Sequence, residues 1–243
     1  MKKIKILAGI ALVGMMAVAC TELQQVAGEV LTTPTTGEKP LTNDEVISGL
    51  KEALTVGAKN SVSLTSAVDG FNGNSLIRIP FPPEAEKVRT KALELGLDEQ
   101  VQKFELTLNR AAEAASKEAV PIFVDAIKGM SIGDGFAILR GEDNAATNYL
   151  REKTSAQLME KFRPVVNNAT QQVELTKYWN PIITTYNKIP FVEKQNPDLD
   201  AYVTERAMAG LFTMVEKEEK KIRDNPAARV SDILKKVFGS LDK

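Results

Sequence analysis

The sequence has no histidine and a single cysteine, Cys20. One cysteine cannot form a disulfide within the chain, and without histidine there is no zinc site of the His/Cys type. The same deficits exclude Ser-His-Asp and Cys-His nucleophilic systems. Carboxylates, lysine, arginine, tyrosine, serine and threonine are therefore the side chains left for any catalysis. Glycine-rich phosphate loops and the spaced acidic residues of a calcium loop are also missing, so we expect no cofactor and no bound metal.

The chain also lacks a surplus of positive charge. It carries 31 Lys and Arg against 32 Asp and Glu, a formal net charge of −1. This balance argues against recognition of nucleic acid or of an anionic lipid surface by charge. Beyond the first twenty residues, no apolar run approaches the length of a membrane span.

The first twenty residues are typical of a bacterial export signal. Three lysines precede an apolar run at positions 6–18, and small residues then lead into Cys20. Because this run is too short to span a bilayer permanently, the layout predicts a signal peptide at 1–19. A cysteine at the cleavage point resembles the lipobox of bacterial lipoproteins, whose thiol receives a diacylglycerol, although Ala17 stands where leucine is usual. The alternative is an ordinary signal peptide beside an incidental cysteine.

Lipidation of Cys20 would make the lipid the link between the chain and the membrane. Thr21 follows the cysteine, whereas an aspartate there would resemble an inner-membrane retention signal. We therefore expect an acylated, lipid-anchored cell-envelope protein at the outer membrane, facing the periplasm. The expected partners are the membrane, through Cys20, and another envelope protein, but not nucleic acid.

The rest of the sequence predicts an all-α fold with a single compact domain at 42–243. Residues 20–41 are rich in threonine and proline and form a flexible tether. Helical periodicity, N-cap residues and prolines predict about eight helices, at 42–59, 84–96, 98–128, 132–139, 144–163, 181–188, 197–224 and 226–239. The segment 68–83 is rich in glycine and proline and forms one irregular loop, in which residues 76–79 are the candidate for a short extended segment.

The helix at 98–128 has a face made of small residues. Alanines recur there at positions 111, 112, 115 and 119, so another helix is expected to approach closely. Pro121 is expected to kink this helix, and Pro164 is expected to end the helix that starts at 144.

Several sequence blocks carry a resemblance to a known family. They are GLKEAL at 49–54, IRIPFP at 77–82, NRAAEAA at 109–115, GEDNAATNYL at 141–150, DLDAYVTERAMAGLF at 198–212 and IRDNPAAR at 222–229. In this order they are similar to domain-of-unknown-function family 4197, found in envelope proteins of Gram-negative bacteria. The resemblance implies a compact helical fold and an envelope location, and it transfers no catalytic residue to this chain.

Glu218 is a carboxylate on an apolar helix face. At 100° per residue it shares a face with Leu211, Val215 and Ile222, while Glu219 points away. We expect Glu218 to be at least half buried and paired with a cation from elsewhere in the chain, with Arg78 and Arg110 as the first candidates. A functional carboxylate, a structural ion pair with an arginine and a helix end that is simply exposed are the three interpretations.

Arg110, Glu113 and Arg78 are the other candidate functional residues. Arg110 and Glu113 lie one turn apart, opposite the alanine face, and are expected to form a surface ion pair unless the 68–83 loop folds over them. Arg78 is the loop residue expected to reach back to a carboxylate. The alternative is that Arg78 points into water.

The sequence therefore favours a lipid-anchored envelope domain that binds or scaffolds and has no catalytic residues. One alternative is an enzyme that cleaves peptidoglycan or another glycan with a carboxylate such as Glu218. A second alternative is a carrier that holds an apolar ligand between its helices.

Overall fold

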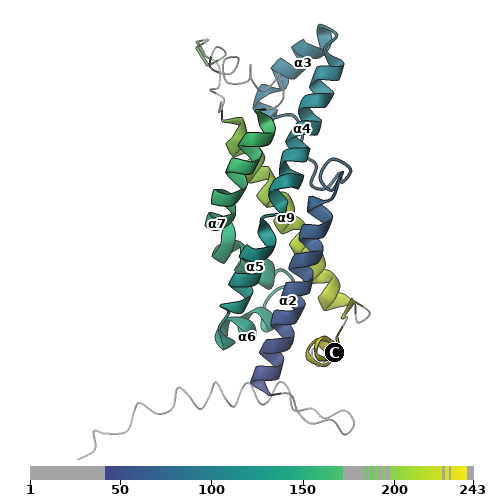
Figure 1. Ribbon diagram of the computed structural model, residues 1–243, viewed down its shortest axis with the longest axis vertical. Helices are drawn as coiled ribbons and strands as arrows, with labels where there is room; N and C mark the ends of the chain where they lie inside the picture. The colour runs from purple at the N-terminus through teal and green to yellow at the C-terminus, as the bar shows by residue number, and fades with distance from the viewer. Residues whose placement is uncertain are drawn as a thin grey trace, which may run out of the picture.

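The computed structural model (Figure 1) describes residues 42–171, 198–225, 228, 229 and 231–239, together with positions 184, 187, 188, 190, 191 and 194. The predicted signal peptide 1–19, Cys20, the tether at 20–41 and five of the eight residues of the helix predicted at 181–188 lie outside these residues. Over the described residues the fold is all-helical and has no strand, which confirms the predicted fold class. None of these helices is both long and apolar enough to cross a membrane.

The described helices follow the chain in the order α2 (Asn43–Ser66), η1 (Pro83–Ala85), α3 (Glu86–Glu94), α4 (Asp98–Ser116), α5 (Ala119–Lys128), α6 (Ile132–Arg140), α7 (Ala145–Thr170), α9 (Leu199–Asp224) and α10 (Asp232–Gly239). Two of them begin at capping boxes, Thr42 with Glu45 and Ser131 with Asp134. α2 runs seven residues beyond its predicted end. α10 starts later than the predicted 226, and the N-cap of α9 is Asp198.

The helix α9 lies at the centre of the bundle. It packs against α7, α2 and α4, and in Figure 1 it crosses behind them along the length of the molecule. The largest fully buried side chains come from several helices and from the 68–83 loop, and include Phe71, Phe104, Phe123, Phe162, Leu108, Leu158 and Leu211. The core is therefore built around the last long helix of the chain.

The alanine face of α4 is buried as predicted. Ala111, Ala112, Ala115 and Ala119 are inaccessible to solvent, and α4 packs against both α7 and α9. The predicted single helix with a kink is wrong, because the chain leaves the helix at 117–118 and restarts as α5. Pro121 then lies in the first turn of α5. Backbone N–H groups in a first turn have no acceptor within the helix, so a proline there removes no helical hydrogen bond.

The prediction that Pro164 ends a helix is also wrong. α7 continues through Pro164 to Thr170. Pro164 lies on the exposed side of α7, whereas Phe162 and Val166 on either side of it are fully buried. Packing of these two side chains holds the helix together, and water can reach the carbonyl that Pro164 leaves without an N–H donor.

Candidate functional site

The 68–83 loop is folded tightly against the bundle. The N–H groups of Ile77 and Arg78 both donate to the carbonyl of Asn74, so residues 76–79 begin in a turn and the predicted extended segment is not formed. Phe71 is fully buried against Gly210 of α9, where an added Cβ would lie 2.6 Å from the Phe71 ring. The absence of a side chain at Gly210 thus lets the loop pack closely against α9.

Glu113 of α4 holds the beginning of this loop. Its carboxylate accepts hydrogen bonds from the backbone N–H of Phe71 (3.1 Å) and of Asn72 (3.4 Å), and pairs with Arg110 at 2.6 Å. The side chain of Glu113 is only 6% exposed, so the prediction that this ion pair lies on the surface is wrong for Glu113. The condition attached to that prediction is met, because the loop does fold over Arg110 and Glu113.

Arg110 joins this carboxylate to a second one in the loop. Its Nη2 lies 3.0 Å from Oδ1 of Asp69, a residue held at a positive φ of 62°. The hydrogen bond from Asn72, and then the charge of Arg110, lower the pKa of Asp69. The hydrogen bond to Glu113 raises the pKa of Arg110. Both shifts favour the charged forms of Asp69 and Arg110.

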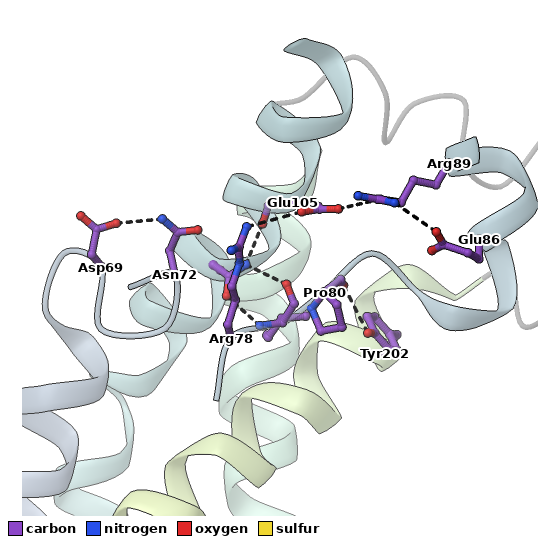
Figure 2. Close-up of polar contacts among 10 residues, drawn as sticks. Asp69, Asn72, Arg78, Pro80, Glu86, Arg89, Glu105 and Tyr202 are labelled. Carbon is purple, nitrogen blue, oxygen red and sulfur yellow. Dashed lines mark hydrogen bonds and ion pairs between the residues drawn. The ribbon is translucent and has the colours of Figure 1, made fainter. Parts of the chain in front are cut away.

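Arg78 reaches back to a carboxylate, as predicted, and the carboxylate is Glu105 of α4 (Figure 2). Glu105 lies 3.5 Å from Arg78 and 3.1 Å from Arg89 of α3, and Arg89 also pairs with Glu86. The Glu105 contact is the main cause that raises the pKa of Arg89. The Arg78 side chain is half exposed, so this pair is weak on its own. Together the pairs connect the loop, α3 and α4.

Asn109 is a site residue that the sequence analysis missed. It is fully buried on α4, where its Oδ1 accepts from the N–H of Ile79 and its Nδ2 donates to the carbonyl of Ile79, both at 2.8 Å. Its place beside the alanine face of the helix indicated that this amide would be buried, and a buried amide needs hydrogen-bond partners.

Glu218 is buried as predicted, with 8% of the residue exposed, but its partners are different from those expected. It accepts a hydrogen bond from Asn60 of α2 at 3.1 Å and pairs with Lys221 of its own helix at 3.4 Å. Arg78 and Arg110 are occupied elsewhere. The structure therefore brings Arg78, Arg110 and Glu113 to the loop, and places Glu218 in a separate contact.

Glu219 was expected to point away from the core and is instead buried. Its carboxylate accepts from the backbone N–H groups of Ala146 (3.0 Å) and Thr147 (2.8 Å) and from the Thr147 hydroxyl. Arg223 donates to it from the next turn of α9, at 2.9 Å, and also to the carbonyl of Ile138. Glu219 thus caps the N-terminus of α7 from another helix, where a negative charge is stabilised by the unpaired N–H groups.

A family comparison agrees with this architecture. The model of the family described as protein of unknown function (DUF4197) matches residues 40–239. The chain belongs to the DUF4197 family. The matched range contains every helix described above. No curated protein and no solved structure matches the chain.

A small crevice in this DUF4197 domain adjoins Glu219 and Arg223. Its walls are otherwise apolar and come from α2, α6, α7, α9 and α10, and its volume of about 20 Å³ has room for little more than a water molecule. No group of three acidic or cysteine side chains that could hold a metal occurs within the described ranges. In this part of the DUF4197 domain the buried carboxylates of Glu113, Glu218 and Glu219 bind donors of the chain itself.

Proposed function

We propose that this chain is a lipid-anchored cell-envelope protein whose helical domain binds or scaffolds an envelope partner and does not catalyse a reaction. The export signal with Cys20 at its end supports the anchor. The buried carboxylates support a binding role without catalysis, because each candidate acid already accepts hydrogen bonds or ion pairs from donors of the fold.

Glu113 gives the clearest example. A general acid or nucleophile must present a carboxylate oxygen to a substrate. One oxygen of Glu113 receives two backbone N–H groups and the other receives Arg110. Glu219 is bound to two N–H groups, a hydroxyl and an arginine. These contacts hold a loop and a helix end in place, which is a structural use of the charge.

Glu218 is the carboxylate on which the enzymatic alternative depends. In cells that lack the chromosomal copy, Glu218→Gln, Glu113→Gln and the exposed control Glu216→Gln should each restore an envelope phenotype, such as detergent resistance, in proportion to the amount of folded protein. The reason is that binding through other surfaces does not need the charge of Glu218. A Glu218→Gln protein that is folded and abundant but inactive in this assay would contradict the proposal and favour glycan cleavage.

The anchor has a separate test. Cys20→Ser should move the protein from the membrane fraction to the soluble envelope fraction, because the acyl chains supply the membrane affinity. Thr21→Ser, which leaves the thiol in place, is the matched control and should stay with the membrane. Unchanged membrane association of Cys20→Ser would contradict the proposed lipidation.

A further inference from the structure

Two helices form an arm that projects from one end of the bundle. We define the arm as residues 86–108, which are α3 and the first three turns of α4. α3 packs against α4 and η1, and none of its residues is fully buried. Figure 1 shows the arm at the end of the molecule opposite to α6 and to the N-terminus of α2. The arm therefore presents its tip away from the place where the tether joins the domain.

The tip of the arm is held in one conformation. α3 ends with Gly96 at a positive φ of 75°. The N–H of Gly96 donates to Leu93 and the N–H of Leu97 donates to Ala92, which together make a Schellman motif. At the base of the arm, Arg89 and Arg78 both pair with Glu105, as Figure 2 shows. The tip is thus fixed both by its own turn and by these ion pairs.

Two leucines at this tip face solvent. Leu97 is 37% exposed, at the position where a Schellman motif is often accompanied by an apolar contact. Leu95 is 67% exposed, although the turn requires no apolar residue at that position. Because the backbone of this turn is already held, covering its leucines costs little backbone entropy, which favours their use as binding anchors.

Negative charge surrounds these leucines. Asp98 and Glu99 are exposed in the first turn of α4. Among the described residues neither carboxylate takes part in an ion pair, whereas Glu94 on the other side of the turn is paired with Lys91. The tip therefore offers an apolar centre with an acidic edge, to which a partner with positive charge is complementary.

We infer that the arm tip, made of Leu95, Leu97, Asp98 and Glu99, docks an envelope protein that has an apolar pocket edged by lysine or arginine. This inference rests on the proposed function as a binding module. A bilayer is the wrong occupant, because anionic headgroups repel the two carboxylates and the tip lies far from the tether. A tip-to-tip contact between two copies of the chain is disfavoured, because it would bring like charges together.

Photo-crosslinking in cells that express the full chain tests this docking. A benzophenone amino acid replaces Leu95 in one strain and Ile132 in a second. Ile132 is the matched control, since it is 50% exposed at the first position of α6, at the opposite end of the bundle. We expect a discrete protein adduct from position 95 and none from position 132. The adduct should weaken several-fold when Asp98→Asn and Glu99→Gln are introduced together.

The protein recovered in that adduct is then purified and its affinity for the intact lipoprotein is measured. We expect Leu95→Glu to raise Kd at least tenfold and to leave Tm unchanged, because the residue is exposed. Added salt should weaken binding of the wild type more than binding of the Asp98→Asn, Glu99→Gln variant. No adduct from position 95, an adduct with lipid, an adduct of twice the mass of the chain, or equal adducts from both positions would overturn the inference. A discrete adduct from position 132 alone would refute the arm tip as the site but leave the binding module intact.

Discussion

The cap that Glu219 places on α7 can be removed by a single substitution. In Glu219→Ala, the N–H groups of Ala146 and Thr147 lose their acceptor, and Arg223 loses its carboxylate. Breaking a buried pair by removing one partner costs about 3–5 kcal/mol. Arg223 keeps its hydrogen bond to the carbonyl of Ile138, so we expect the lower end of this range, about 3 kcal/mol. Glu219→Gln keeps one carbonyl acceptor and should cost about 1–2 kcal/mol.

The assay is urea and thermal unfolding of the Cys20→Ser chain, followed by circular dichroism. A loss of about 3 kcal/mol lowers Tm by roughly 6–12 °C in a domain of this size. Glu216→Ala, an exposed site on the same helix, is the control and should change stability by less than about 0.5 kcal/mol. Amide hydrogen exchange should become faster at Ala146 and Thr147 in the Glu219 variants. A loss below about 1 kcal/mol, or unchanged exchange at these two amides, would refute the assigned cap.

Three further outcomes follow from buried or capping residues. Ala115→Leu should overpack the α4 face and cost about 1–3 kcal/mol, whereas Ala156→Leu on the exposed side of α7 should cost little; equal melting temperatures would show that the α4 face has room. Among the described residues the buried Thr204 hydroxyl has no hydrogen-bond partner, so Thr204→Val should stabilise the fold by about 1 kcal/mol, and a lower Tm would contradict this. The hydrogen bond from the Ser131 hydroxyl, then that from its N–H, holds the pKa of Asp134 below 3.8. The folded chain therefore gains stability from Asp134 above that pH and loses it as the pH falls through the lower folded pKa. The Tm advantage of the wild type over Asp134→Asn should accordingly be steady at neutral pH and disappear in acid, and a difference independent of pH would contradict this assignment.

Features that depend on a few neighbouring residues were predictable from the sequence. The helix starts at Thr42 and Ser131 are examples, because each capping box is complete within four residues. The burial of the alanine face of α4 was also predictable, because small side chains on one face allow close approach whichever helix packs there. The helix ends were less predictable, because the exposure of Pro164 depends on how α7 packs in the bundle.

The partners of the buried carboxylates could not be predicted from the sequence. The helical wheel of α9 assumed one buried face and therefore placed Glu219 outside. In the structure α2, α4 and α7 all pack on α9, so both Glu218 and Glu219 are buried. The backbone N–H groups that Glu219 caps lie more than 70 positions away in the chain, and no local pattern identifies them. The sequence indicated that a carboxylate would be buried here, but only the packing decided what it binds.

The central place of α9 also determines when this domain can close during synthesis. Until residues beyond 198 have been made, the apolar surfaces that α2, α4 and α7 present to α9 are uncovered. A partly made chain is then an open set of helices whose shared surface binds chaperones or aggregates. The element that completes the fold therefore leaves the nascent chain open until the last long helix has been made.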